Sequence, residues 1–263
     1  MSLRIRGEQV YKDARTLRIP SLISPLPLIK PLKPPPPPKT NPIKPPPPTM
    51  ALATQLAAVL DGFNRDVPTP IKDPINAARS EVITTFPRSA AIQPGALLPP
   101  FSLANASGGQ TTSAALLAQS PILITFYRGG WCPFCNLALH DLQVNLEAFK
   151  AKGVTLVAIS PELPDESLST AEKNELKFIV LSDVGNQFAR QLGIVWKQPG
   201  AMDGALKAIG TDLKQRNGDD SLEVPVPCTL LVDQKGVVRN AHVEPDYTKR
   251  LDSKVALGWA DAL

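Results

Sequence analysis

Two cysteines separated by two residues are the side chains of this sequence with the clearest chemical potential. Cys132 and Cys135 lie in the segment Trp131-Cys132-Pro133-Phe134-Cys135. A thiolate attacks a substrate sulfur or oxygen, and a second thiol nearby resolves the product as a disulfide. On the first turn of a helix this spacing puts both side chains on one face, where they can form that bond without backbone rearrangement. The pair therefore predicts thiol redox chemistry with a reversible disulfide.

The elements next to the pair indicate how it is positioned. Residues 121–127 form a continuous apolar run typical of a buried strand, which passes through Arg128-Gly129-Gly130 into the cysteines. Apolar residues at helical spacing follow over residues 137–149, and residues 154–159 are typical of a second buried strand. In such a strand-helix-strand unit the cysteines lie at the carboxyl edge of the sheet, with Cys132 at the helix N-terminus. Free N–H groups and the helix dipole stabilise a thiolate there and lower its pKa.

A metal site is the alternative use of such a cysteine pair. Zinc needs four ligands, usually from a second pair of this kind or from two histidines. The remaining candidates are Cys228, His140 and His242, and they do not form either pattern. His140 stands five residues after Cys135 and does not share its helical face. We therefore expect no metal. Because there is no GxGxxG motif, we also expect no flavin or nicotinamide cofactor, so electrons must come from another protein or a small thiol.

The rest of the chain from residue 50 predicts an α/β fold, with a central mixed sheet flanked by helices and an N-terminal helical extension. Apolar residues at helical spacing or in short runs predict further helices at residues 51–64, 74–86, 113–118, 167–176 and 186–192, and strands at residues 101–103, 178–181 and 194–196. Residues 229–232 and 237–242 alternate around the turn at residues 233–236, which is typical of a hairpin. The region before this hairpin, with a polar loop at residues 216–223, is expected to be looser.

Several motifs resemble those of a known family. Residues 126–135 are FYRGGWCPFC, and the chain continues with Ser160-Pro161-Glu162, Leu181-Ser182-Asp183, Val226-Pro227-Cys228 and the run from His242 to Arg250. Over about residues 50–260 the sequence resembles the peroxiredoxin-like branch of the alkyl hydroperoxide reductase and thiol-specific antioxidant family, in the thioredoxin-like superfamily. The resemblance implies a thioredoxin-like fold and antioxidant dithiol chemistry on a peroxide or a disulfide. It also implies a thiol electron donor of the thioredoxin, glutaredoxin or glutathione type.

The resemblance also assigns residues around the pair. In thioredoxin-like proteins a cis-proline precedes the hairpin and faces the cysteines, and the match places this role on Pro227. Cys228, the next residue, is either a small core residue or a further resolving thiol. The activating arginine of peroxiredoxins precedes the hairpin strand, and that position falls close to Pro227. Arg128 then remains as an electrostatic substitute or a solvated residue, and Trp131 as a shield over the cysteines.

The two analogies disagree about which cysteine attacks. The PxxxTxxC motif of peroxiredoxins places Cys135 at the peroxidatic position, but Cys132 stands where the threonine belongs. Since the threonine and the arginine of that arrangement are missing, we expect Cys132 to be the nucleophile and Cys135 the resolving thiol. Two other functions stay open. One is a thioredoxin-like protein-disulfide reductase without peroxidase activity, and the other is a non-catalytic interaction module displaying a polyproline tail.

The first 49 residues differ in composition from the rest of the chain. They hold 14 of the 29 prolines and nine Lys and Arg against two acidic residues, whereas residues 50–263 hold 19 basic and 22 acidic residues. We expect residues 1–49 to be a disordered, basic, proline-rich leader, with the folded unit starting at Met50. The domain then spans residues 50–263, and residues 50–90 are its helical extension. Proline-rich runs such as residues 34–38 can also bind SH3 or WW modules.

Composition also bounds the location and the partners. The net charge of +4 reflects the leader, so it does not indicate nucleic-acid binding. The apolar runs are too short for a membrane span, and no apolar segment typical of a secretory signal follows the first arginines. Three cysteines, two of them in a reactive pair, fit a reducing compartment. We expect a cytoplasmic protein, with a mitochondrial presequence in residues 1–19 as the alternative.

Overall fold

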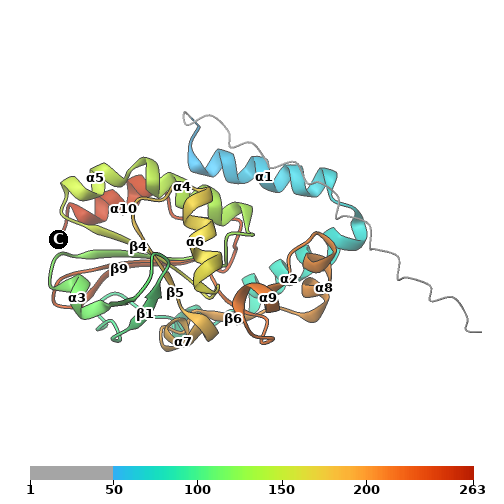
Figure 1. The fold of residues 1–263 in the computed structure, drawn as a ribbon. Coiled ribbons are helices and arrows are strands. Elements are labelled where there is room, and N and C mark those ends of the chain that lie inside the picture. Colours follow the sequence, from blue (N-terminus) through green and yellow to red (C-terminus); the bar gives the residue numbers. More distant parts are fainter. Residues whose placement is uncertain (1–49) are drawn as a thin grey trace, which may run out of the picture. The chain divides into compact units, whose positions relative to one another are not determined.

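The computed structural model describes residues 50–263, and the predictions for the first 49 residues lie outside this range. Its centre is a seven-stranded mixed sheet with the strand order β2-β1-β5-β4-β3-β8-β9 (Figure 1). A separate two-stranded sheet pairs β6 with β7. The strands are β1 (Ser102–Asn105), β2 (Gln110–Thr112), β3 (Ile122–Phe126), β4 (Thr155–Ser160), β5 (Ile179–Ser182), β6 (Val195–Lys197), β7 (Glu223–Pro225), β8 (Cys228–Val232) and β9 (Val238–Val243).

Ten α-helices and two 3-10 helices surround the sheets in the described part. Helices α5 and α10 lie on one face of the central sheet and α3 and α7 on the other (Figure 1). None of these helices is long and apolar enough to cross a membrane. Their bounds are α1 (Leu52–Asp66), α2 (Thr69–Thr85), η1 (Arg88–Ala90), α3 (Ser113–Leu117), α4 (Pro133–Val144), α5 (Leu146–Ala151), α6 (Pro164–Lys173), η2 (Val184–Asn186), α7 (Gln187–Gln191), α8 (Gly200–Ala208), α9 (Leu213–Asn217) and α10 (Ser253–Ala260).

Strand β3 is the central strand that leads to the cysteines. It pairs in parallel with β4 and antiparallel with β8, so that Ile124 lies between Val157 and Leu230. Side chains of a strand alternate between the two faces of its sheet. Accordingly, Leu123 packs in the cluster beneath α5 and α10, whereas Ile122 joins the larger cluster that also holds residues of α2 and α7. Both faces of β3 are therefore buried, which explains its continuous apolar sequence.

The two N-terminal helices are present, as predicted. Helix α1 contacts α4, and α2 contacts α8. Helix α2 begins at Thr69, five residues before the predicted start, because Pro70 is well suited to a first helical turn. Its residues Ala78 and Val82 are buried against the main core. The extension therefore packs on the domain as an integral part of it.

Three regions differ from the prediction. The segment expected to be loose holds α8, α9 and β7, and α10 near the C-terminus was not predicted at all. Both α9 and α10 are short and begin at an aspartate cap, with Asp212 accepting a hydrogen bond from the Lys214 N–H and Asp252 accepting one from the Lys254 N–H. The helix predicted over residues 137–149 is also divided, because Asn145 leaves the helical conformation between α4 and α5. Short or capped helices of this kind carry too few periodic residues for recognition from sequence.

Candidate active site

The loop between β3 and α4 is held in place by close packing around two glycines. Gly129 has a φ of +143°, a conformation that favours glycine. A Cβ on Gly130 would overlap the Thr170 hydroxyl. The Gly130 N–H donates to Glu162 Oε2 at 2.8 Å, and Arg216 Nε donates to Glu162 Oε1 at 2.7 Å. The Glu162 carboxylate and the lack of side chains on Gly129 and Gly130 therefore fix the conformation of the loop that leads to the cysteines.

Both cysteines lie at the start of α4, as their spacing predicted. Cys132 is the N-cap residue, Pro133 occupies the first turn, and the Cys135 N–H donates to the Cys132 carbonyl at 3.0 Å. Both are free thiols and almost completely buried, with 1% of Cys132 and none of Cys135 exposed. The first turn of α4 thus presents two neighbouring sulfurs that are closed off from bulk solvent.

An arginine from a distant segment contacts the second sulfur. Arg250 Nη2 donates to Cys135 Sγ at 3.0 Å, across 115 residues of sequence. Arg250 lies between β9 and α10, where its other terminal nitrogen donates to the carbonyls of Tyr247 and Lys249. These two carbonyls fix the direction of the guanidinium. A cation with a fixed direction at hydrogen-bond distance is a strong stabiliser of a thiolate.

Helix α2 holds the segment that carries Arg250. Asp246 accepts two hydrogen bonds from Arg79, each of 2.7 Å, and one from the Thr248 hydroxyl, also of 2.7 Å. The Tyr247 hydroxyl donates to the Ile75 carbonyl at 3.2 Å. Burial opposes ionisation of Asp246, but the hydrogen bonds from Arg79 and Thr248 lower the pKa of its carboxyl to about 2. The segment is therefore clamped to α2 by a bidentate ion pair.

A second arginine lies next to the first sulfur. Arg128 is 2% exposed, and its Nη1 is 4.0 Å from Cys132 Sγ. Its guanidinium carbon is 4.6 Å from the Trp131 ring centre and 3.9 Å from that of Tyr247, and Nη2 donates to Gln198 at 3.4 Å. Arg128 is therefore buried between two aromatic rings and is not a solvated residue. Trp131 covers this arginine.

The two thiols have opposite pKa shifts. Burial alone would raise the pKa of Cys135, but a hydrogen bond from Cys132, the charges of Arg250 and Arg128 and the Arg128 backbone N–H together lower it well below its usual value. Burial and the adjacent Cys135 raise the pKa of Cys132 well above its usual value. These directions, with the 3.0 Å contact from Arg250, favour Cys135 as the more acidic thiol and Cys132 as its hydrogen-bond donor. The expectation from sequence that Cys132 attacks stays a prediction, and the contact from Arg250 weighs against it.

The prediction of a cis-proline at Pro227 is wrong. No peptide bond within residues 50–263 is cis, and the Pro227 carbonyl accepts a hydrogen bond of 2.9 Å from the Glu244 N–H. The proline directly precedes β8 and lacks the cis bond of thioredoxin-like proteins. Cys228 follows it opposite Phe126, and burial raises the pKa of its thiol. Its environment is that of a core residue.

The remaining sequence-predicted residues contribute in different ways. His140 and His242 are both half-buried, and burial lowers the pKa of His242. Sequence reasoning did not find Arg250. The run from residue 242 to 250 had been noted for its resemblance, but no spacing rule links it to Cys135. Glu162 was noted in the same way, without its role in holding Gly130.

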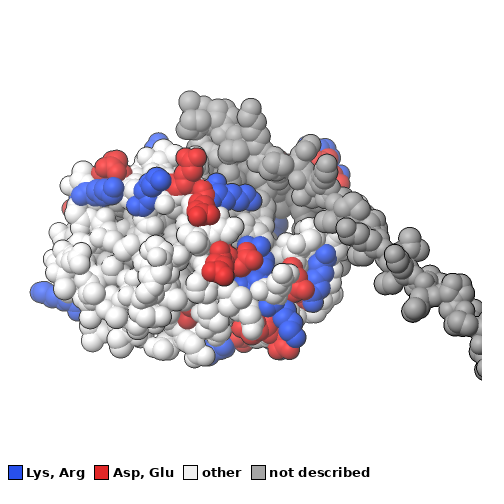
Figure 2. Space-filling model, viewed as in Figure 1, with Lys and Arg blue, Asp and Glu red and all other residues white. Residues whose placement is uncertain are grey.

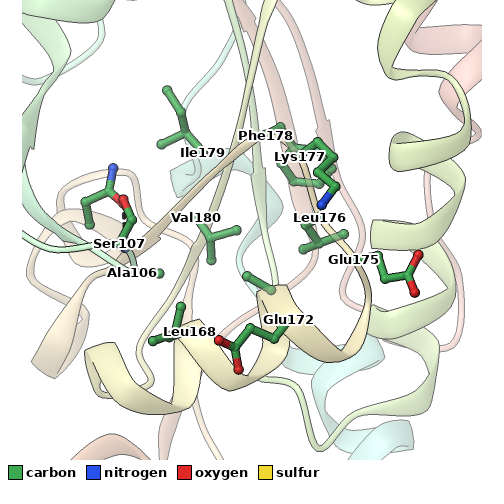
Figure 3. Close-up of a pocket in the computed structure, with 12 residues that line it drawn as sticks. Ala106, Ser107, Leu168, Glu172, Glu175, Leu176, Lys177, Phe178, Ile179 and Val180 are labelled. Atoms are coloured by element: carbon green, nitrogen blue, oxygen red, sulfur yellow. Dashed lines mark hydrogen bonds between the residues drawn. The ribbon is translucent and has the colours of Figure 1, made fainter.

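A pocket in the described part lies away from the cysteines. It has a volume of about 580 Å³, and Leu168, Phe178 and Val180 point into it (Figure 3). It lies beside the amino end of β5, whereas Cys132 and Cys135 follow the carboxyl end of β3. Since β3, β4 and β5 are parallel, these are opposite edges of the sheet. On the face in Figure 2, basic and acidic side chains alternate without forming a patch of one sign.

A central mixed sheet with a buried dithiol at a helix N-terminus, one of whose sulfurs is held by an arginine, defines a thiol-dependent oxidoreductase. Comparison with family models identifies its family. The model of the AhpC/TSA family matches residues 94–241, more than half of the chain. The chain therefore belongs to the AhpC/TSA family, and it is a peroxiredoxin-like antioxidant oxidoreductase of the thioredoxin superfamily.

Known relatives agree with this family. The chain is 28% identical to peroxiredoxin Bcp of Escherichia coli K12 over 168 residues, which is 64% of this chain and 95% of the relative. It is also 28% identical to the chloroplastic peroxiredoxin Q of Sedum lineare over 129 residues, 49% of this chain and 67% of the relative.

Solved structures show the same fold. Peroxidoxin BcpB from Mycobacterium tuberculosis has a TM-score of 0.51 at 18% identity, covering 65% of this chain and 98% of its own. Reduced Prx3 from Vibrio vulnificus in complex with hydrogen peroxide has a TM-score of 0.52 at 20% identity, covering 64% of this chain and 99% of its own.

The family model matches residues 94–241, so it begins after Arg79 and ends before Asp246. The ion pair between these two residues, which positions Arg250, therefore lies outside the matched residues.

Proposed function

We propose that this protein reduces hydroperoxides, with Cys135 as the attacking thiolate and Cys132 as the resolving thiol. The observation that carries the proposal is the 3.0 Å contact between Arg250 and Cys135 Sγ. It gives Cys135 a fixed positive partner and so a low pKa. Peroxide reduction requires a thiolate, and it also creates negative charge on the leaving oxygen, which a neighbouring guanidinium stabilises.

The first step is oxidation of Cys135. Its thiolate attacks one oxygen of the hydroperoxide, an S–O bond forms and the O–O bond breaks. Sulfur gives up two electrons, and Cys135 becomes a sulfenic acid. The leaving oxygen takes a proton and departs as water or an alcohol. Arg250 stabilises the thiolate before the attack and the departing oxyanion during it.

The second step closes the disulfide. The Cys132 thiolate attacks Cys135 Sγ, an S–S bond forms, the S–O bond breaks and hydroxide leaves as water. A dithiol donor, or two molecules of a monothiol, then supplies two electrons by thiol-disulfide exchange. We place the donor's attack on Cys132, because it is the N-cap residue and lies next to the exposed Pro133. Attack there expels Cys135, whose low pKa makes it the better leaving group.

The burial of the pair favours a small oxidant over a protein disulfide. Neither cysteine presents a sulfur to the surface, and their exposed fractions are 0% and 1%. In this reduced state, hydrogen peroxide, which is close to water in size, can reach such a sulfur more easily than a disulfide within a folded protein, whereas the thiol donor acts later, on the oxidised pair. The names of the relatives, peroxiredoxin Bcp and peroxiredoxin Q, point to the same substrate class. A cytoplasmic location and SH3- or WW-type partners of the leader stay predictions.

The experiment that tests the proposal compares two oxidants. The reduced full-length protein is mixed with hydrogen peroxide or with glutathione disulfide in a stopped-flow instrument, and tryptophan fluorescence is followed. We expect oxidation by peroxide to be at least about 100-fold faster than that of free cysteine at pH 7, and faster than oxidation by glutathione disulfide. Cys135→Ser should abolish the fast reaction, and Cys132→Ser should retain it. A protein that reacts with peroxide no faster than free cysteine does not have the proposed function.

A further inference from the structure

Arg128 is a buried cation without a carboxylate partner among residues 50–263. It is 2% exposed, and among residues 50–263 no carboxylate forms an ion pair with it. Its Nε has no hydrogen-bond partner within this range, and neither has Nε2 of the adjacent Gln198. Burying a charge without a counter-ion is costly, and the two flanking aromatic rings offset part of that cost. Such a group is suited to an anion that forms during turnover.

The nearest group that becomes anionic is Cys132. Its sulfur lies 4.0 Å from Arg128 Nη1, whereas Arg250 donates its hydrogen bond of 3.0 Å to Cys135 Sγ. Both charges act on both sulfurs, but each guanidinium is in direct contact with a different one. The distances also follow the order of the proposed chemistry, in which Cys135 is the thiolate of the reduced protein and Cys132 becomes one later.

We propose that Arg128 is a catalytic residue of the second step, in which it stabilises the Cys132 thiolate that attacks the sulfenic acid on Cys135. This inference rests on the proposed peroxidase function. In the reduced protein the negative charge on Cys135 opposes ionisation of Cys132. Once Cys135 is a neutral sulfenic acid, that opposition ends, and the guanidinium of Arg128 attracts the charge on Cys132. Arg250 thus acts mainly in the first step and Arg128 mainly in the second.

The size of the effect follows from charge and nucleophilicity. An opposite charge within about 4–6 Å shifts a pKa by about 1–3 units, and losing two units reduces the thiolate population about 100-fold. The more basic thiolate is about tenfold more nucleophilic, since the Brønsted coefficient is about 0.4–0.5. Disulfide formation should therefore slow by about tenfold at pH 7 when Arg128 is replaced by an uncharged residue.

The experiment separates the two steps in the full-length protein. Quenched-flow mass spectrometry after mixing with hydrogen peroxide measures sulfenic acid as one added oxygen and disulfide as the loss of two hydrogens. In Arg128→Met the ratio of the disulfide-forming rate to the oxidation rate should fall about tenfold, and sulfenic acid should accumulate. Raising the pH should restore the slowed step, and Arg128→Lys should restore most of it at pH 7. Arg250→Met should lower the oxidation rate instead.

A second variant protects the test against misfolding. Gln198→Met removes the 3.4 Å anchor of Arg128 but keeps the cation, and the same ratio should fall in the same direction. If Arg128→Met does not fold, the rate ratio of Gln198→Met tests the role of Arg128 in its place. An unchanged ratio in the folded variants overturns the role of Arg128 while the peroxidase proposal stands. A wild-type protein that forms no sulfenic acid or disulfide faster than a free thiol overturns the peroxidase proposal itself.

Discussion

Two regions meet at the active site, and they are recognised from sequence very differently. The segment from β3 to α4 carries Cys132 and Cys135 within a motif of ten residues and lies inside the family match. The segment between β9 and α10, with the helix α2 that holds it, lies outside the match and supplies Arg250. The first region provides the sulfurs, and the second places a cation 3.0 Å from one of them. A motif can therefore identify the reaction type without identifying the reactive atom.

The largest effect should come from removing the charge that the second region supplies. Arg250→Met is expected to slow the reaction of Cys135 with hydrogen peroxide by about 100-fold at pH 7. It raises the pKa of the thiol and removes a donor from the leaving oxygen, which alone contributes about 100-fold or more in related transition states. Stopped-flow fluorescence under single-turnover conditions measures this rate.

Arg250→Lys is the matched control for this variant. It keeps a cation but loses the guanidinium geometry, so we expect an intermediate rate. If Arg250→Met oxidises at the wild-type rate, the second region does not set the reactivity of Cys135, and the comparison between the two regions fails.

The first region can be disturbed without touching either sulfur. Gly130→Ala places a methyl group against the Thr170 hydroxyl, and overpacking of this kind typically costs about 1–3 kcal/mol. We expect the free energy of unfolding to fall by about 2 kcal/mol in urea denaturation. The control is Gly204→Ala in α8, where a Cβ meets nothing within 4 Å and the protein should gain about 0.5–1 kcal/mol. Equal stability of the two variants would show that the loop between β3 and α4 accommodates the methyl group, and would contradict the close packing against Thr170.

The clamp on α2 should have a smaller effect on rate. Arg79→Met breaks the bidentate pair with Asp246 and lets the segment that carries Arg250 move, so we expect peroxide oxidation to slow by about tenfold. Arg88→Met is the matched control, because Arg88 pairs with Glu244 on the same segment but is 52% exposed. Its oxidation rate should stay within about twofold, as expected for a surface ion pair. Equal slowing in both variants would mean that the clamp has no special role.

The last prediction concerns stability in acid and leaves the reaction rate aside. The pKa of Asp246 is about 2 in the folded protein, below its value of about 3.9 in an unfolded chain. A lowered pKa stabilises the fold fully above pH 4, and this contribution is lost as the pH falls toward 2. Asp246→Asn should therefore destabilise the protein at pH 6 but have less effect near pH 2. Thermal unfolding across this pH range measures the difference, and a constant difference would contradict the role of the carboxylate.

The sequence predicted those features that depend on neighbours along the chain. The central strand, the helix that begins at the cysteines, the N-terminal helices and the hairpin all follow from periodicity or turn residues. Arg250 was missed because its contact with Cys135 spans 115 residues and depends on a clamp from α2. The burial of Arg128 was missed for a similar reason, since Tyr247 and Gln198 reach it from distant elements. The family pattern suggested the cis bond at Pro227, which the structure does not contain.

The central claim is that Cys135 is the thiolate of the reduced protein, and the absorbance of thiolates near 240 nm tests it directly. The absorbance is measured as a function of pH in the wild type, Cys132→Ser and Cys135→Ser, with alkylated protein as the blank. We expect a thiolate that persists well below pH 8.5 in the wild type and in Cys132→Ser, and that disappears in Cys135→Ser. A low-pH thiolate that remains in Cys135→Ser and is lost in Cys132→Ser would contradict the account.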